Sequence, residues 1–137
     1  MKKIQMLLLA VAMLFSLSAV QAGDVSPMTV EGATTVDAAK AKELFDSGVL
    51  FVDVRSNKDW EAGRIPDAVH LELKSNYTAD SLGAEMKKDE AVVIYCNGEK
   101  CLRSSKASKM AVEWGFSSVY YFRDGFPAWK AAGYPAE

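Results

Sequence analysis

The chain has 137 residues, half of them hydrophobic, with 16 basic and 18 acidic side chains and a formal net charge of −2 at pH 7. A single domain of this size can bury a hydrophobic core without help from metals or disulfides. The slightly acidic balance argues against nucleic acid or an anionic membrane surface as a partner, because both attract basic proteins.

The first residues have the pattern of a secretory signal peptide. Two lysines precede an apolar run over residues 6–15, and small residues follow at 18–22, where a signal peptidase cleaves. The run is shorter than the roughly 20 apolar residues that a membrane-spanning helix needs. We therefore expect cleavage after Ala22, a single domain over 23–137, and a periplasmic or secreted protein. An uncleaved membrane anchor is the alternative.

The rest of the chain alternates between strand and helix patterns. Strands are predicted at 34–36, 49–54, 69–73, 91–95 and 117–122. Helices are predicted at 38–46 with Asp37 as N-cap, at 57–63, at 81–86, from a cap at Ser104 or Ser105 to Trp114, and at 126–132. Strands that alternate with helices form right-handed βαβ units. The pattern therefore predicts a three-layer α/β fold, with a central, mainly parallel sheet and helices on both of its faces.

Both cysteines lie in one stretch, YCNGEKCLRSS at 95–105, directly after an apolar strand. Ligands of open α/β sheets bind beyond the carboxyl ends of the strands, and Cys96 is placed at such an end. Loop amides and a helix N-terminus bind anions and lower the pKa of a thiol. We therefore expect Cys96 to be a catalytic nucleophile for an anionic substrate. The expected substrate loop is Asn97, Gly98, Glu99, Lys100, Cys101, Leu102, Arg103 and Ser104.

Two other interpretations of the cysteine pair remain open. A structural disulfide is possible because a curled loop of this length can bring the Cα atoms to the required separation of roughly 4.4–6.8 Å, and exported proteins meet an oxidising compartment. So small a ring, however, removes little entropy from the unfolded chain. A zinc clip needs four ligands, whereas the chain has two cysteines and the single histidine His70. We expect no metal and no cofactor.

Three motifs, taken together and in this order, resemble the rhodanese family. FVDVR at 51–55 with WEAGRIPDA at 60–68 resembles the family's Asp-Val-Arg strand and its following E-x-x-x-G-H-I-P-G-A pattern. Cys96 before a loop and an Arg-Ser pair resembles the active-site loop. FRDGFPAW at 122–129 with GYP at 133–135 is similar to the closing G-G-x-x-x-W…G-x-P pattern. The resemblance covers essentially all of residues 23–137.

The resemblance implies a rhodanese-like fold and a single-domain sulfurtransferase of the thiosulfate sulfurtransferase type. Cys96 would take a sulfane sulfur from thiosulfate or another sulfane donor, hold it as a persulfide, and pass it to cyanide or a thiol. Loop amides would stabilise the persulfide. We expect Asp53 and Arg55 to be structural. The expected partners are a small sulfur-containing anion or persulfide donor and a thiol redox partner protein, with no nucleic acid and no membrane after signal cleavage.

The loop departs from the family pattern. Six residues separate Cys96 from Arg103, where the family's sulfurtransferases usually have four and related phosphatases five. Arg64 and Asp67 replace the pattern's histidine and second glycine. The longer loop puts thiosulfate in doubt as the substrate.

The second cysteine opens a further alternative. Cys101 is a candidate resolving thiol that would convert a Cys96 persulfide or sulfenate into a disulfide, and the reverse assignment is also open. A periplasmic thiol–disulfide redox protein that uses the Cys96/Cys101 pair is therefore the alternative function. A phosphatase or arsenate reductase is a third hypothesis. A non-catalytic binding module is disfavoured because the nucleophile position is intact.

Overall fold

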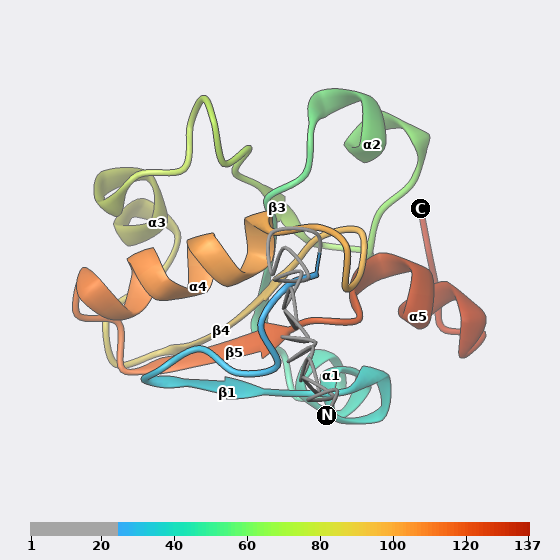
Figure 1. The fold of residues 1–137 in the computed structure, drawn as a ribbon, viewed down its shortest axis with the longest axis horizontal. Coiled ribbons are helices and arrows are strands. Elements are labelled where there is room, and N and C mark those ends of the chain that lie inside the picture. Colours follow the sequence, from blue (N-terminus) through green and yellow to red (C-terminus); the bar gives the residue numbers. More distant parts are fainter. Residues whose placement is uncertain (1–24) are drawn as a thin grey trace, which may run out of the picture.

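Every neighbouring pair of strands in the sheet is parallel. The computed structural model describes residues 25–137, so the predicted signal peptide lies outside the described residues. The strand order is β1-β5-β4-β2-β3 (Figure 1). The strands are β1 (Ala33–Thr35), β2 (Leu50–Asp53), β3 (Val69–His70), β4 (Ala91–Tyr95) and β5 (Ser118–Phe122). The helices are α1 (Ala38–Asp46), α2 (Asn57–Ala62), α3 (Ala79–Glu85), α4 (Arg103–Glu113) and α5 (Gly125–Ala131).

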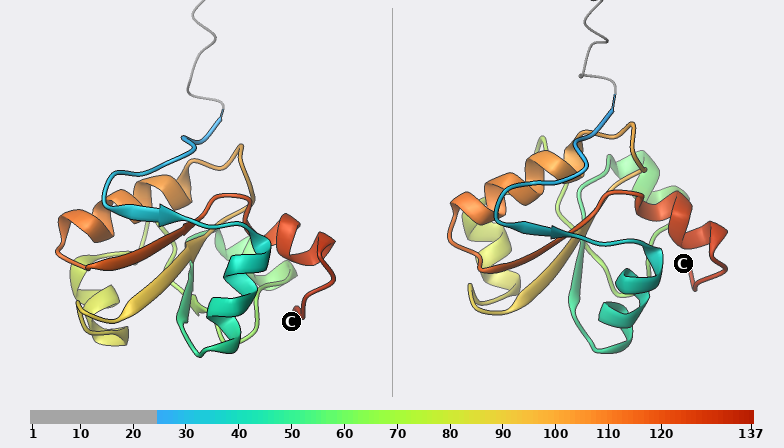
Figure 2. Two further views of the ribbon diagram at one scale, coloured as in Figure 1. Left: turned by 90° about the horizontal axis from the view of Figure 1, so that it is seen from below. Right: turned by 60° about the horizontal axis from the view of Figure 1, so that its bottom comes forward.

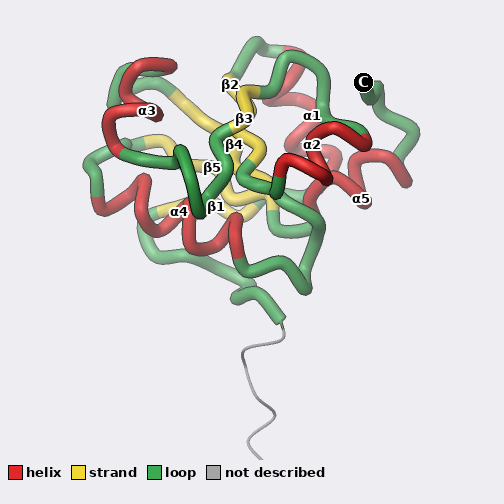
Figure 3. Tube along the Cα trace, turned by 90° about the horizontal axis from the view of Figure 1, so that it is seen from above, coloured by secondary structure: helices red, strands yellow, loops and turns green. Residues whose placement is uncertain are grey.

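Helices cover both faces of the sheet, which confirms the predicted three-layer α/β fold. Helices α3 and α4 lie on one side of the strands, and α1 and α5 lie on the other (Figures 2 and 3). Successive residues of β4 point to opposite layers, so that Val92 and Ile94 pack in the core beneath α3 and α4, while Val93 and Tyr95 pack with α1 and α5. Both layers are apolar, as expected for a strand that is buried on both faces. No helix in the described part of the chain has the length and apolarity needed to cross a bilayer.

Local sequence signals explain several helix ends. The side chain of Asp37 accepts a hydrogen bond from the backbone N–H of Lys40 at 2.8 Å, and α1 begins there as predicted. Gly48 follows the end of α1 with a φ of +84°, a conformation that favours glycine. Helix α3 begins earlier than predicted because Thr78 and Ser81 form a reciprocal capping box.

Two predicted boundaries are wrong. Helix α4 begins at Arg103 after Leu102, so that neither Ser104 nor Ser105 is its N-cap. Both serines lie inside the first turn, and the hydroxyl of Ser105 donates to the carbonyl of Leu102 instead. The strand predicted at 69–73 shortens to Val69–His70, because the carbonyl of Glu72 already accepts backbone hydrogen bonds from a turn over residues 75–77.

The first turn of α5 fixes the beginning of the cysteine loop. The backbone N–H of Phe126 donates to the carbonyl of Cys96 at 2.9 Å. Gly125 has a φ of +61°, and its Cα lies so close to this carbonyl that a Cβ atom would overlap the oxygen. Glycine is therefore required at position 125 by its conformation and by its contact.

Replacing Gly125 with alanine should destabilise the protein by more than about 2 kcal/mol, because a left-handed conformation alone costs about 1–2 kcal/mol and the overlap with Cys96 adds to it. Urea unfolding measures the change. Gly48→Ala is the matched control, since Gly48 has a similar φ and no neighbouring atom where the Cβ would lie. Equal losses in the two variants would contradict the proposed contact.

Candidate active site

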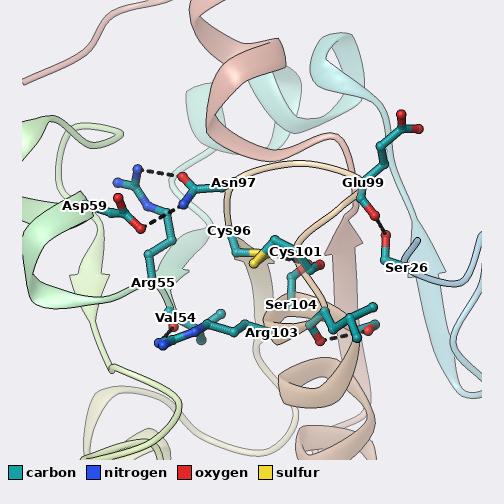
Figure 4. The surroundings of a disulfide bond; sticks show 12 residues. Ser26, Val54, Arg55, Asp59, Cys96, Asn97, Glu99, Cys101, Arg103 and Ser104 are labelled. Atoms are coloured by element: carbon teal, nitrogen blue, oxygen red, sulfur yellow. Dashed lines mark hydrogen bonds between the residues drawn. A yellow bond between two sulfur atoms is a disulfide. The ribbon is translucent and has the colours of Figure 1, made fainter. Parts of the chain in front are cut away.

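Cys96 lies at the carboxyl end of β4, the central strand of the sheet, and directly before the loop that leads to α4 (Figure 4). Its side chain is fully buried and belongs to the core beneath α3 and α4. The ends of β2 and β5 flank it, because both strands pair with β4 in parallel. The sequence therefore places this cysteine at the sheet edge where α/β proteins bind ligands.

A disulfide joins Cys96 to Cys101 in this structure. The two Cα atoms are 6.4 Å apart, within the range that disulfides span. Cys96 has no exposed surface, whereas Cys101 is half-buried at the edge of the same apolar cluster. The two cysteines of the disulfide thus have unequal access to solvent.

A hydroxyl and a carbonyl contact the sulfur of Cys96. The Oγ of Ser104, in the first turn of α4, lies 3.2 Å from this sulfur. A disulfide sulfur carries no proton, so the hydroxyl is the donor. The carbonyl oxygen of Cys101 lies 3.5 Å from the same sulfur. The expected ring of loop amides is not among these contacts and stays a prediction for the reduced loop.

Most loop amides have no acceptor in the described part of the chain. The hydrogen bond from the N–H of Cys101 to the carbonyl of Gly98, at 3.0 Å, is the one that the loop forms within itself. Asn97, Glu99 and Lys100 are exposed, while Gly98 is buried and has a φ of +106°. The backbone of residues 97–102 therefore keeps donors that an anion can use.

The N-terminal segment holds the middle of the loop. The N–H and the hydroxyl of Ser26 both donate to the carbonyl of Glu99, at 2.6 and 2.8 Å (Figure 4). Arg123 donates in turn to the carbonyl of Ser26 and lies 3.6 Å from the carboxylate of Glu99. Ser26 is buried although it comes before the first strand. Ser26, which is 73 positions from Glu99 and 97 positions from Arg123, thus fixes this part of the loop.

A buried ion pair holds the start of the loop. The guanidinium of Arg55 donates to both carboxylate oxygens of Asp53, with the shortest distance 2.7 Å, and to the carbonyl of Gly63 at 2.6 Å. It also donates to the side-chain oxygen of Asn97 at 3.1 Å, and the amide nitrogen of Asn97 donates to Asp59 at 2.8 Å. The pair ties the end of β2 to helix α2 and to the residue that follows Cys96.

Arg103 binds away from the sulfur. Its guanidinium donates to the carbonyl of Val54 at 3.2 Å and forms an ion pair with Glu72. The pKa of Glu72 is held below its usual value, chiefly by the hydroxyl of Ser75 and also by Arg103. The place predicted for Arg103 in the substrate loop stays a prediction, and contact with an anion requires the guanidinium to share or leave Glu72.

His70 has a structural environment. Its Nε2 lies 2.8 Å from the carbonyl of Arg55, and its ring stacks on Trp60 with the centroids 4.7 Å apart.

Among the residues that hold the loop, sequence reasoning missed Ser26, Asp59, Glu72 and Arg123. Each of them acts through a partner far away in the chain, for which the local pattern gives no signal.

A family model described as the rhodanese-like domain matches residues 37–132, most of the chain. The chain belongs to the rhodanese-like domain family. Thiosulfate sulfurtransferase GlpE of Pseudomonas savastanoi pv. phaseolicola is 34% identical over 99 residues, which are 72% of this chain and 87% of that protein. The relatives named GlpE support membership in a sulfurtransferase family.

The rhodanese-like domain also occurs as part of longer proteins. The HTH-type transcriptional regulator Rv0324 of Mycobacterium tuberculosis is 32% identical over 119 residues, and the match spans 87% of this chain but 50% of that regulator. The solution structure of the rhodanese-like domain of Alr3790 from Anabaena superposes with a TM-score of 0.65 at 25% identity, covering 75% of this chain and 77% of that one. The resemblance to rhodanese seen in the sequence is thereby confirmed at the level of family and fold.

Replacing Arg55 with methionine should cost about 3–5 kcal/mol of unfolding free energy, because it leaves the carboxylate of Asp53 buried without its counter-charge. The double variant Asp53→Leu/Arg55→Met should recover most of this loss. Arg64→Met is the control, since Arg64 pairs with Glu137 at the surface and such pairs are worth less than about 1 kcal/mol. Urea unfolding of the four proteins measures the differences, and a loss in Arg55→Met as small as in Arg64→Met would contradict the assignment.

Replacing Ser26 with alanine should loosen the loop without unfolding the domain. The variant loses one of the two hydrogen bonds to Glu99, so the amide of Cys101 should exchange with deuterium about fivefold faster, as for the loss of one ordinary hydrogen bond. Ser117→Ala removes a hydroxyl bond to Lys88, outside the cysteine loop, and should leave that exchange unchanged. Unchanged exchange in both variants would show that Ser26 does not hold the loop.

Proposed function

We propose that the protein is a sulfurtransferase that carries sulfane sulfur as a persulfide on Cys96. The observation that carries the proposal is the position of Cys96, at the end of the central strand and against the first turn of α4, in a rhodanese-like domain. A helix N-terminus favours a negative charge on such a sulfur. A persulfide formed there is a covalent intermediate that divides the transfer into two steps.

In the first step, the thiolate of Cys96 attacks the sulfane sulfur of a donor. The donor's S–S bond breaks, its electron pair leaves with sulfite or with a thiolate, and Cys96 keeps the terminal sulfur. In the second step, cyanide or an acceptor thiolate attacks that terminal sulfur and releases Cys96. Thiosulfate and small persulfides are the donors that we propose.

Residues of the chain assist both steps. The hydroxyl of Ser104 is within hydrogen-bond distance of the Cys96 sulfur. It would stabilise the Cys96 thiolate before the first step and again when the second step releases it. Amides of residues 97–102 would bind the oxyanion of the donor. Lys100 is exposed beside Cys101 and favours the approach of an anion.

The disulfide must be reduced before the first step, because a disulfide sulfur cannot attack a donor. We therefore propose a thiol redox partner in addition to the small sulfur donor. We also propose that the protein is periplasmic or secreted, with its signal peptide removed after Ala22. An oxidising compartment agrees with the presence of the Cys96–Cys101 bond.

The same bond favours a second candidate function, that of a thiol–disulfide redox protein. Here Cys96 and Cys101 would exchange electrons with a dithiol partner and carry no sulfane sulfur. The reduction potential separates this candidate from an inert structural bond, since structural disulfides lie below about −300 mV.

The reduced protein, incubated with thiosulfate or glutathione persulfide, should gain about 32 Da per sulfur transferred to Cys96. Mass spectrometry measures the gain on the intact protein and on the peptide that contains Cys96. Cys96→Ser should gain nothing. Cys101→Ser should keep the added sulfur longer, because no neighbouring thiol can displace it. The absence of an adduct with every sulfane donor would refute the sulfurtransferase and leave the redox protein.

A further inference from the structure

We propose that a small anionic thiol opens the disulfide by attacking the sulfur of Cys101, and that Cys96 leaves as the thiolate. Cys101 is then the entry site for the reductant. The inference rests on the proposed function, in which Cys96 accepts sulfur. It adds the step that frees Cys96 from the disulfide. The order of attack follows from access, from the leaving group and from charge.

Access to the two sulfurs differs. A thiolate attacks a disulfide sulfur from the side opposite the leaving sulfur. Cys96 belongs to the apolar core together with Val54 and Ile94 and has no exposed surface. Cys101 is half-buried, at the edge of this cluster. An external thiol can therefore reach Cys101 without opening the core.

The surroundings of Cys96 suit a leaving group. Thiol–disulfide exchange is faster when the departing sulfur has the lower pKa. The hydroxyl of Ser104 lies 3.2 Å from the Cys96 sulfur, and Ser104 belongs to the first turn of the 11-residue helix α4. Figure 4 shows Ser104 beside the disulfide. Charge that develops on Cys96 thus meets a hydrogen-bond donor and the positive end of a helix, which oppose the repulsion from the carbonyl oxygen of Cys101 at 3.5 Å.

Charge near Cys101 favours an anionic thiol. Lys100 precedes Cys101 and is exposed. Arg103 is paired with Glu72 and Arg123 with Glu99, whereas Lys100 takes part in none of the ion pairs formed within residues 25–137. A cation next to the attacked sulfur raises the local concentration of an anion such as glutathione.

The step is balanced with thiol as the only co-reactant. A thiolate forms a bond to the Cys101 sulfur, the bond between Cys101 and Cys96 breaks, and its electron pair goes to Cys96. A second thiolate then attacks the added sulfur and releases Cys101. Two thiols are oxidised to one disulfide, and the protein pair is reduced.

The chain offers a direct test, because Lys100 separates the two cysteines. Oxidised protein is mixed with glutathione, the reaction is stopped at early times with excess N-ethylmaleimide, and the protein is digested with endoproteinase Lys-C, which places Cys96 in peptide 89–100 and Cys101 in peptide 101–106. We expect glutathione on Cys101 and maleimide on Cys96, with at least about tenfold more glutathione on Cys101. Glutathione mainly on Cys96, or equally on both, would overturn the proposal.

Two serines on the same helix test the leaving group. Ser104→Ala should slow the opening about fivefold, as expected for the loss of one hydrogen bond. Ser108→Ala is the matched control, because Ser108 is one turn further along α4, is equally buried, and its hydroxyl has no hydrogen-bond partner. In a Cys101→Ser background, Ser104→Ala should also raise the pH at which the ultraviolet absorbance of the Cys96 thiolate develops. Equal opening rates and equal titration curves for the two serine variants would overturn the assignment of Cys96 as the assisted leaving group.

The outcomes separate this inference from the proposed function. Glutathione on Cys96, together with a normal persulfide on reduced Cys96, would refute the entry site and leave the sulfurtransferase intact. Glutathione on Cys101 with no persulfide from any donor would refute the sulfurtransferase and leave the entry site intact.

Discussion

The buried charge of Arg55 is the constraint on which the site depends. An ion taken out of water is tolerated only where oxygens replace its hydration, and Arg55 is 3% exposed. Those oxygens come from the end of β2, from the turn after α2 and from the residue after Cys96. The rings of Phe126 and Tyr95 cover the guanidinium, with centroids 4.6 and 5.7 Å away. Four segments therefore have to meet around one cation, and the position of Cys96 at the start of the loop follows from that meeting.

The oxidised loop is shaped differently from the loop that the proposed sulfur transfer needs. The carbonyl oxygen of Cys101 faces the Cys96 sulfur, which is acceptable for a neutral disulfide but repels a thiolate. After reduction this repulsion disfavours the present orientation of the Cys101 carbonyl. An orientation in which loop N–H groups face the sulfur is then more stable. The hydrogen bonds from Ser26 hold Glu99, and the guanidinium of Arg55 holds Asn97. A change in the loop would therefore be confined to the few peptide units near Cys101.

The fold was largely predictable because its signals are local. The apolar strands around Phe51 and Val93, the cap at Asp37 and the glycine at Gly48 each depend on neighbours within a few residues, and the alternation of strands and helices then determines a parallel sheet. The family resemblance added the order of the motifs, including the glycine at 125 that packs on Cys96.

The details of the site were less predictable, for a physical reason. Ser104 looks like a helix cap because serine is common there, yet its hydroxyl is used by a sulfur eight residues earlier. Arg103 resembles an anion ligand, but Glu72, 31 positions away, binds it. The partner of each side chain depends on which residues the tertiary fold brings together. The pattern of a single sequence contains no signal for such contacts.

The loop is anchored at both ends and held between them chiefly at Glu99, which bears on how the family can diversify. Cys96 is fastened by the backbone of Phe126, Asn97 by Arg55, and the far end by the first turn of α4. Insertions between these anchors lengthen an exposed turn and leave the sheet and its helices untouched. Evolution can therefore change the length of the loop, or add a second cysteine to it, while the rest of the scaffold stays the same.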